Sequence, residues 1–336
     1  MRIAIIGAGS WGTALAKVLN DNKHEVVCYT IEDEVIQTVT ENKENTRYLP
    51  QIKLSPSIRF TMNLKEALNG TELILIAVPS QIIRNVIPQI TDNTSVNEKL
   101  FVTVAKGIEN NTYKRASQII QEVGKISPEQ IVALSGPSHA EEVAREIPTA
   151  VVAASVSLST AKTVQNVFMN HYFRVYGSQD IRGVELGGAL KNIIALAAGI
   201  CDGAGLGDNS KAALMTRGLV EMSRLGVAME ADSATFAGLS GMGDLIVTCM
   251  SKHSRNRYVG EQIGKGRKLQ EILDEMVMVA EGVKTTLSAF ELSKKMYVEM
   301  PITEQIYLTL FKEKAPLEAL NDLMTRASKI EDWGDE

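Results

Sequence analysis

The sequence predicts an α/β domain, built as a parallel sheet covered by helices, followed by an all-helical domain. Short apolar runs alternate with helical patterns through the first half of the chain, and after about residue 180 almost every apolar pattern has the helical period. Because 336 residues are enough for two domains with separate cores, we place the domains at residues 1–180 and 181–336.

Strands are predicted in the first domain where short runs are rich in apolar and β-branched residues. Helical patterns at Thr13–Asn20 and Ile82–Gln89 lie between the early runs, which are apolar on both faces, as in a parallel sheet. The predicted strands are Ile3–Ile6, Glu25–Tyr29, Leu73–Val78, Phe101–Ala105, Ile131–Leu134, Ala150–Ala153 and Arg174–Tyr176.

The second domain is predicted from apolar residues that recur at helical spacing. Since neither an internal repeat nor a long flexible linker is evident in the sequence, we expect a firm domain interface, and such interfaces often hold small-ligand clefts. The predicted helices are Gly183–Ile200, Ser210–Met229, Arg255–Ile263, Leu269–Met276, Thr285–Lys295 and Thr303–Phe311.

Composition narrows the class of protein. Hydrophobic residues make up 45% and charged residues 22%, as in soluble globular proteins, and a net charge of −5 without a basic stripe argues against a nucleic-acid partner. We expect no membrane span, and the apolar N-terminal stretch is too short for a signal peptide. The scattered Cys28, Cys201 and Cys249 form neither a disulfide framework nor a metal site, so we expect a cytoplasmic protein without a metal.

A glycine-rich segment, Gly7-Ala8-Gly9-Ser10-Trp11-Gly12, follows the first predicted strand and opens the first helix. One glycine permits a tight turn, another lets the backbone approach a pyrophosphate, and the third permits close helix–strand packing. The anion then lies at the positive end of the helix dipole. In this context the motif predicts a Rossmann dinucleotide-binding domain.

The second strand leaves the choice of nicotinamide cofactor open. An acidic residue at its end favours a ribose 2′-hydroxyl, and a nearby arginine favours a 2′-phosphate. Here the strand runs into Thr30-Ile31, with Glu32 and Asp33 just beyond, which is neither signature. Arg47 and Lys53 are interpreted as ordinary surface charges.

Lys191 lies inside an otherwise apolar predicted helix, on a face whose neighbours are glycines and alanines. A helix-interior glycine costs up to about 1 kcal/mol relative to alanine, so this face has a reason to be bare. Close helix packing, with the lysine reaching out to water, is one explanation. The other is a desolvated ammonium that exchanges a proton with a ketone oxygen, and the helix alone does not decide between them.

Further polar groups fall where strands end or helices begin. Lys106 follows a strand, Ser135–Glu141 forms a strand-to-helix turn, and Asp244 and Thr248 share a helix face. Ser254–Arg257 combines groups that bind phosphate. Taken singly, each is explained almost as well by a helix cap or a solvated charge, and the scattered histidines, including His139 and His253, are interpreted as incidental.

Together these segments resemble the NAD(P)-dependent glycerol-3-phosphate dehydrogenases, particularly the bacterial type, over essentially the whole chain. The matching segments are Gly7–Ala14, Ala105-Lys106-Gly107, Ser135-Gly136-Pro137-Ser138, Glu185–Asn192, Cys201-Asp202-Gly203, Gly241–Leu245 and Ser254-Arg255-Asn256. One departure stands at Thr30-Ile31, where bacterial members often carry arginine or histidine, so that either NADP or NAD remains a candidate.

The resemblance implies that Lys191 is the proton donor and acceptor, oriented by Asp244, and that Lys106 contacts both cofactor and substrate. It implies that Gly136, Ser138, Asp244, Arg255 and Asn256 line the substrate, with Arg255 and Asn256 at its phosphate. It also implies cofactor contacts from Gly7, Gly9, Ser10, Trp11, Gly12, Ala140, Ser254, Arg255, Val279 and Glu281.

The expected activity is therefore reduction of dihydroxyacetone phosphate to sn-glycerol 3-phosphate, which the family supplies for glycerophospholipid synthesis. One alternative is a related two-domain dehydrogenase of a 3-hydroxy acid or a sugar acid, which would not need the phosphate-binding groups at Ser254–Arg257. Another is an NAD(H) sensor without turnover, which would need a partner-binding module that the sequence does not display. A homodimer is a candidate assembly.

Overall fold

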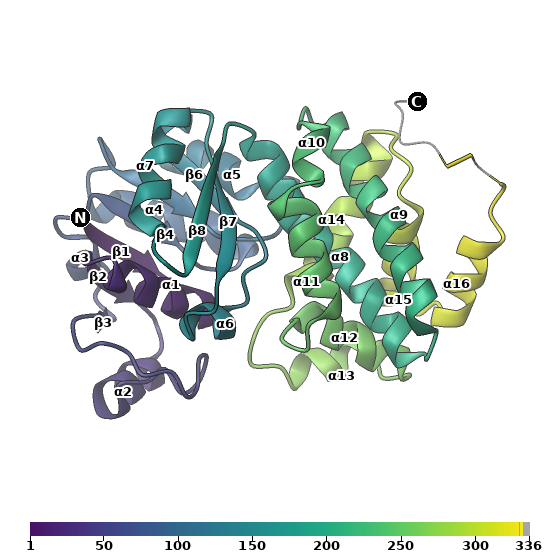
Figure 1. Cartoon of the computed structure of the whole chain (residues 1–336), viewed down its shortest axis with the longest axis horizontal. Coiled ribbons are helices and arrows are strands. Elements are labelled where there is room, and N and C mark those ends of the chain that lie inside the picture. Colours follow the sequence, from purple (N-terminus) through teal and green to yellow (C-terminus); the bar gives the residue numbers. More distant parts are fainter. Residues whose placement is uncertain (329, 332–336) are drawn as a thin grey trace.

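A computed structural model describes residues 1–328 and 330–331, and the chain forms two lobes that lie side by side (Figure 1). The lobe that contains the N-terminus is built around one eight-stranded sheet. Its strands are β1 (Arg2–Ile6), β2 (Glu25–Tyr29), β3 (Arg59–Thr61), β4 (Leu73–Ile76), β5 (Leu100–Thr103), β6 (Ile131–Ser135), β7 (Thr149–Ala154) and β8 (Phe173–Ser178).

Helices cover the sheet and form the whole of the second lobe. Those of the sheet lobe are α1 (Ser10–Asp21), α2 (Asp33–Asn42), α3 (Leu64–Leu68), η1 (Ser80–Ile82), α4 (Ile83–Asn93), α5 (Ala116–Gly124), η2 (Pro128–Gln130), α6 (Ala140–Ala144) and α7 (Leu158–Phe168). Those of the helical lobe are α8 (Ile181–Gly203), α9 (Gly207–Ala228), α10 (Ser233–Phe236), η3 (Leu239–Gly243), α11 (Asp244–Met250), α12 (Arg255–Gly264), α13 (Leu269–Asp274), α14 (Glu281–Lys295), α15 (Pro301–Phe311) and α16 (Pro316–Met324).

The strand order places β1 in the interior of the sheet, with β2 and β3 on one side and β4 to β8 on the other. The order is β3-β2-β1-β4-β5-β6-β7-β8, and Ile3 of β1 pairs with Val26 on one side and Leu73 on the other. The order therefore reverses between β1 and β4, and ligands of open α/β sheets bind outside the carboxyl ends of the strands at such a point.

The sheet is not parallel throughout, which corrects the expectation of a purely parallel sheet. β7 runs antiparallel to β6, whereas every other neighbouring pair is parallel. Between β6 and β7 the chain forms only the five-residue α6, so it returns without a full crossover helix. The fold class is nevertheless confirmed, because a Rossmann-type sheet domain is followed by a helical one.

Both faces of the central strands are buried, each in its own hydrophobic cluster. Ile3 and Ile5 point to the face covered in part by α1, whereas Ala4 and Ile6 point to the face covered by α4 and α5. A separate cluster fills the helical lobe around α8. This burial explains why the sequence shows continuous apolar runs rather than alternation in these strands.

Helix α8 is the central helix of the second lobe. By length and composition it is apolar enough to cross a membrane, but its whole apolar window is buried inside the protein, as in a core helix. A Cβ atom at Gly187 would lie 2.7 Å from the carbonyl oxygen of Ser240, and one at Gly199 would overlap the backbone of α12. The bare helix face thus permits close packing of neighbouring backbones.

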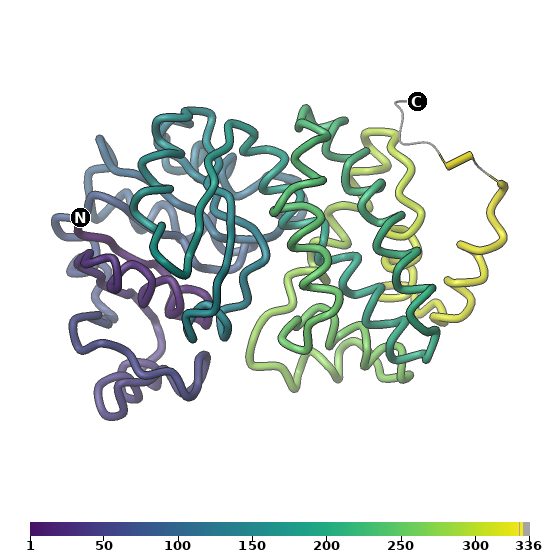
Figure 2. Tube along the Cα trace, viewed as in Figure 1, coloured from purple at the N-terminus to yellow at the C-terminus, as the bar shows by residue number. Residues whose placement is uncertain are grey.

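Buried polar contacts join the two lobes, which follow one another along the tube in Figure 2. The Glu185 carboxylate of α8 accepts hydrogen bonds from Ser117 N at 2.7 Å and Ser117 Oγ at 2.6 Å, and it pairs with Arg115. Because these groups are buried, separating the lobes here would leave charges without partners. Helix α8 is therefore held at a fixed position against the sheet lobe.

Candidate active site

The glycine loop between β1 and α1 has the geometry of an anion cradle. Gly7 has φ of +107°, and a Cβ atom there would lie 2.7 Å from the carbonyl oxygen of Ala77, so a larger residue does not fit. At Gly9, by contrast, nothing lies within 4 Å of the Cβ position among the described residues. The loop is therefore tight on the side of the sheet and open on the side of the cleft.

The N-terminus of α1 fits an anionic pyrophosphate. Its cap residue is Gly9, and within the described part of the chain no side chain caps the helix and no acidic residue lies in its first turn. The first backbone N–H groups of a helix have no partner within the helix, and its dipole favours a negative charge there. These features meet the requirements of a dinucleotide-binding loop.

Lys191 of α8 is buried, with only 5% of its surface exposed. Its Nζ atom donates a hydrogen bond to Thr248 Oγ1 at 2.6 Å and forms an ion pair with Asp244 Oδ1 at 3.0 Å. The lysine therefore does not extend to bulk water, and the bare helix face accommodates both close backbone packing and a buried, paired ammonium.

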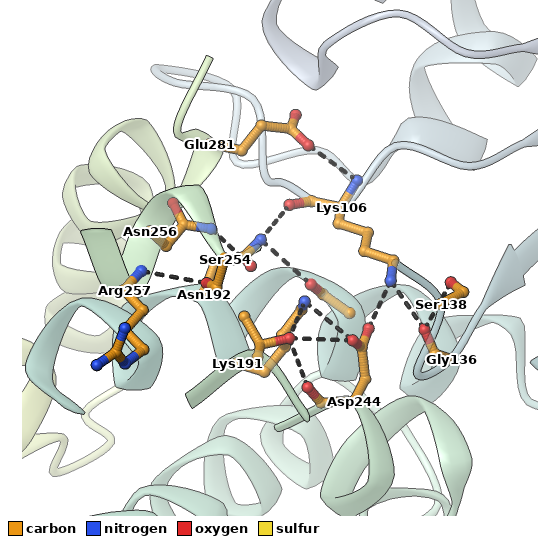
Figure 3. A network of polar contacts seen from close by, with 12 residues as sticks. Lys106, Gly136, Ser138, Lys191, Asn192, Asp244, Ser254, Asn256, Arg257 and Glu281 are labelled. Carbon is orange, nitrogen blue, oxygen red and sulfur yellow. Dashed lines mark hydrogen bonds and ion pairs between the residues drawn. The ribbon is translucent and has the colours of Figure 1, made fainter. Parts of the chain in front are cut away.

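A second lysine reaches the same carboxylate from the other lobe. Lys106, just past β5, pairs with Asp244 Oδ2 at 2.7 Å and donates to the Gly136 carbonyl at 2.9 Å. Figure 3 shows the two lysine side chains converging on Asp244, which lies at the start of α11. Thr248, one turn later on α11, donates to the Asp244 carbonyl at 2.6 Å. This hydrogen bond orients Thr248 Oγ1, which accepts from Lys191 Nζ.

Burial and the neighbouring charges set the protonation of this cluster. Burial lowers the pKa of Lys191 to about 8, and Lys106 acts in the same direction, although the attraction of Asp244 opposes the change. Burial alone would raise the pKa of Asp244, but Lys106 and Lys191 together hold it below its usual value. The site therefore combines a permanent carboxylate with an ammonium that can give up its proton near neutral pH.

A chain of amide groups connects the lysines to α12 and α14. Asn192 Nδ2 donates to the Lys106 carbonyl at 2.9 Å, and Asn256 Nδ2 donates to Asn192 Oδ1 at 2.9 Å. Asn256 Oδ1 in turn accepts from Gly282 N at 2.9 Å. The side chain of Asn256 is thus fixed at the position where the family resemblance implies a phosphate contact.

These groups line one cleft of about 530 Å³ that runs between the glycine loop and the helical lobe. Of the predicted site residues, those that line it are Gly7, Gly9, Ser10, Trp11, Lys106, Ser138, Ala140, Lys191, Asp244, Ser254, Arg255, Asn256, Val279 and Glu281. The structure thus brings together side chains from distant parts of the sequence.

Two predicted residues lie behind the wall of the cleft. Gly136 contributes its carbonyl to Lys106, and Gly12 packs against the backbone of Gly7. Each therefore supports a neighbour that does line the cleft.

The two arginines near the start of α12 differ in their surroundings. Arg257 forms ion pairs with Asp202 at 2.6 Å and Glu261 at 3.5 Å, so it is committed to the packing of α8 and α12. Arg255 is exposed, lines the cleft and has no ion-pair partner among the described residues. An unpaired guanidinium beside Asn256 suits an anionic group of a ligand.

Reasoning from the sequence did not assign roles to Asn192 or to the acceptor function of Glu281. The Glu281 carboxylate, at the start of α14, accepts from Ser80 N at 2.8 Å and Lys106 N at 3.3 Å, and so joins the lobes above the cleft. The signal for Asn192 is its position beside Lys191 in an apolar helix. Glu281 carries no comparable signal, because its partners are backbone groups of distant loops.

The histidines interpreted as incidental both line the cleft. The rings of His139 and His253 lie 5.8 Å apart, centroid to centroid, and come from opposite lobes. Burial lowers the pKa of His139, and so do Lys191 and Lys106. A neutral imidazole therefore faces this part of the cleft, and no role follows for it from the contacts.

Comparisons with known proteins confirm the resemblance. Residues 2–161 match the model of the NAD-dependent glycerol-3-phosphate dehydrogenase N-terminus, and residues 180–321 match that of its C-terminus. A protein of Citrifermentans bemidjiense named glycerol-3-phosphate dehydrogenase [NAD(P)+] is 54% identical over 333 residues, which are 98% of each chain. One of Bacillus subtilis with the same name is 51% identical and covers 98% of this chain and 96% of its own.

A solved structure agrees with these sequence relatives. The crystal structure of glycerol-3-phosphate dehydrogenase from Coxiella burnetii has a TM-score of 0.91 and 36% identity, and the match covers 97% of this chain and 99% of that one. Both lobes are therefore shared, and not the sheet domain alone.

Proposed function

Since this chain belongs to the NAD-dependent glycerol-3-phosphate dehydrogenase family, we propose that it reduces dihydroxyacetone phosphate reversibly to sn-glycerol 3-phosphate. The observation that carries the proposal is the buried Lys191–Asp244–Lys106 cluster, which faces the same cleft as the glycine loop. Proton transfer to a carbonyl oxygen requires such a positioned acid, and reduction of a ketone requires a hydride source beside it.

The glycine loop and the uncapped start of α1 would hold the pyrophosphate of NAD or NADP, with Ser10 and Trp11 in the first helical turn. Ala140, Ser254, Val279 and Glu281 would contact the rest of the cofactor from the cleft wall. When bound, the nicotinamide supplies the hydride that reduces the carbonyl carbon.

Lys191 is the proposed catalytic acid. Protonated, it donates a hydrogen bond to the ketone oxygen, stabilises the negative charge that develops there, and then transfers its proton to give the alcohol. In alcohol oxidation the neutral amine accepts that proton. Asp244 and Thr248 orient the Nζ atom, and the attraction of the carboxylate keeps the buried ammonium sufficiently basic.

The remaining groups bind and orient the substrate. Arg255 and Asn256 would take its phosphate, at a distance from the reacting carbon that allows binding energy to align the ketone. Lys106, fixed by Asp244 and by the Gly136 carbonyl, would contact both substrate and cofactor, and Ser138 would complete the wall beside it.

The other assignments extend from this proposal. We place the domains at 1–180 and 181–336, the protein in the cytoplasm and its product in glycerophospholipid synthesis. The free, buried cysteines fit a reducing compartment.

A homodimer is the proposed assembly, supported by Met242, Ile246 and Met250, which are exposed at helical spacing along η3 and α11. Sedimentation equilibrium measures that state.

A pH dependence follows from the pKa of Lys191, which burial lowers to about 8. We expect kcat/KM for ketone reduction to fall as the pH rises through about 8, because the deprotonated amine cannot act as an acid, and the corresponding value for alcohol oxidation to rise. The second pKa of a phosphate monoester is about 6, so ionisation of the substrate phosphate does not cause this change in kcat/KM. A reduction profile that stays flat between about pH 7 and 9 would remove Lys191 as the acid.

A substrate panel tests the proposed function. With excess NADH, and separately NADPH, steady-state rates are measured for dihydroxyacetone phosphate, unphosphorylated dihydroxyacetone and acetoacetate, a 3-oxo acid. We expect kcat/KM for the phosphorylated ketone to exceed the others by about 100-fold or more, because two charge-assisted contacts are lost without the phosphate. A preference for acetoacetate would favour the hydroxy-acid alternative, and binding of cofactor without any turnover would favour the sensor.

A further inference from the structure

We propose that Glu32 makes this protein selective for NAD(H) over NADP(H), an inference that rests on the proposed function. The two cofactors differ only in a phosphate on the 2′-oxygen of the adenosine ribose. In Rossmann domains the side chain that meets this position comes from the end of the second strand or just beyond it.

The end of β2 lies directly beside the glycine loop. Ile6 of β1 pairs with Tyr29 of β2, and Gly7 N donates to the Tyr29 carbonyl at 3.0 Å. Beyond Tyr29 the chain continues along the cleft wall, where Glu32 is one of the lining residues. A dinucleotide whose pyrophosphate lies at Gly9 therefore directs its adenosine ribose toward the Glu32 carboxylate.

Contacts within the sheet lobe hold this carboxylate in place. Tyr48 Oη donates to Glu32 Oε1 at 2.7 Å, and the backbone N–H of Glu32 donates to Thr30 Oγ1 at 3.2 Å. Glu32 Oε2 lies 3.3 Å from Arg47 Nε but, among the described residues, accepts no well-aligned hydrogen bond. Oε2 can therefore still accept a hydrogen bond, and a small rotation of the Glu32 side chain would direct it at a ribose hydroxyl.

The cations nearby are already paired. Arg47 contacts Glu34 as well as Glu32, and Lys53 pairs with Glu44 at 3.1 Å, so neither presents a free charge. Neither residue lines the cleft in the described structure. The cationic side chains that do line it come from the loop after β5, from α8 and from α12, where the proposed reaction takes place.

The start of α2 would otherwise attract an anion, but its own residues fill that role. Glu32 is the cap residue, and Asp33 and Glu34 lie in the first turn. Three carboxylates against the single guanidinium of Arg47 leave this turn negative, so a dianionic 2′-phosphate meets repulsion. A ribose 2′-hydroxyl instead donates a hydrogen bond to a carboxylate, which is a charge-assisted contact.

Equilibrium binding tests the inference independently of turnover. The full-length protein is titrated calorimetrically with NADH and, separately, with NADPH, and the ratio of the two dissociation constants is taken. We expect NADH to bind about 10- to 100-fold more tightly, the range for gain or loss of one hydrogen bond to a charged group. NADPH binding as tightly as NADH, or more tightly, would overturn the inference.

Two variants assign the selectivity to Glu32. We expect Glu32→Gln to lower the ratio of dissociation constants about tenfold or more, by removing the charge while keeping the shape of the side chain. Glu34→Gln is the matched control, because it also removes one carboxylate from this turn and releases Arg47, but changes a residue outside the cleft wall. We expect its ratio to change clearly less than that of Glu32→Gln. An unchanged ratio in Glu32→Gln, or an equal change in both variants, would contradict the assignment.

These outcomes separate the inference from the proposed function. If the protein binds NADH selectively but does not turn over dihydroxyacetone phosphate, the inference about Glu32 stands and the proposed activity is overturned. Turnover with both cofactors at similar dissociation constants would overturn the inference alone, and failure to bind either cofactor would overturn both.

Discussion

Replacing Lys191 by alanine is expected to lower kcat for reduction of dihydroxyacetone phosphate by about 10²- to 10⁴-fold, the usual contribution of a positioned general acid. The side chain is buried and positioned by Asp244 and Thr248, so its removal leaves the proposed site without this positioned acid. Binding of the dinucleotide, measured by calorimetry, is expected to change little, because the proposed partner of Lys191 is the carbonyl.

The conservative variant separates charge from proton transfer. Lys191→Arg keeps a cation but places a group whose pKa is too high to donate a proton efficiently near neutral pH. We expect its kcat to remain close to that of Lys191→Ala, with cofactor binding retained. Recovery of activity in Lys191→Arg would mean that the side chain acts through its charge alone. Near-normal turnover in Lys191→Ala would remove the residue from the chemistry.

Replacing Arg255 by alanine is expected to raise the KM for dihydroxyacetone phosphate by about 10- to 100-fold, with a smaller effect on kcat. Arg255 is an exposed, cleft-lining cation without an ion-pair partner among the described residues, so its loss disrupts no structural contact of that kind. Steady-state kinetics at saturating cofactor measure this change. The free energy of unfolding is expected to stay within about 0.5 kcal/mol of the unmodified protein.

Lys252→Ala is the matched control for Arg255. Lys252 is also exposed and lies on the loop just before α12, but it does not line the cleft, so its removal changes the local charge equally. We expect an unchanged KM for dihydroxyacetone phosphate in this variant. A similar rise in both variants would indicate a long-range electrostatic effect, and no rise in Arg255→Ala would place the phosphate elsewhere.

Much of the sheet domain could be predicted because its strands are buried on both faces. The bounds predicted for β2, Glu25–Tyr29, agree with the structure, and the other long apolar strands differ by one or two residues at their ends. β3, Arg59–Thr61, was missed because it is short and partly exposed, so it has no apolar run. The reversed direction of β7 depends on pairing with β6 and leaves no mark in local periodicity.

The helical domain was predicted from periodicity, which missed the four-residue α10 and the largely unburied α16. α16, Pro316–Met324, buries only Ala319 among its residues, so its apolar positions give little sign of a core-facing side. α8 was predicted within a few residues at each end because its sequence is apolar on all sides.

The site could be predicted in its parts but not in its assembly. Lys191 was noticed because a buried charge among glycines is unusual, yet packing and catalysis explained that pattern equally well. The ion pair with Asp244, which also pairs with Lys106 from the other lobe, shows that the buried lysine has a charged partner. Lys106 and Asp244, 138 residues apart in the chain, leave no local pattern, and the family resemblance placed both in one site without predicting that they pair.

The proposed reaction is tested by following the consumption of NADH with dihydroxyacetone phosphate as loss of reduced-nicotinamide absorbance. The amount of NADH consumed is compared with the amount of sn-glycerol 3-phosphate formed. We expect the two amounts to be equal and neither to change without the phosphorylated ketone. Folded protein that binds NADH but forms no glycerol 3-phosphate would contradict the proposed function.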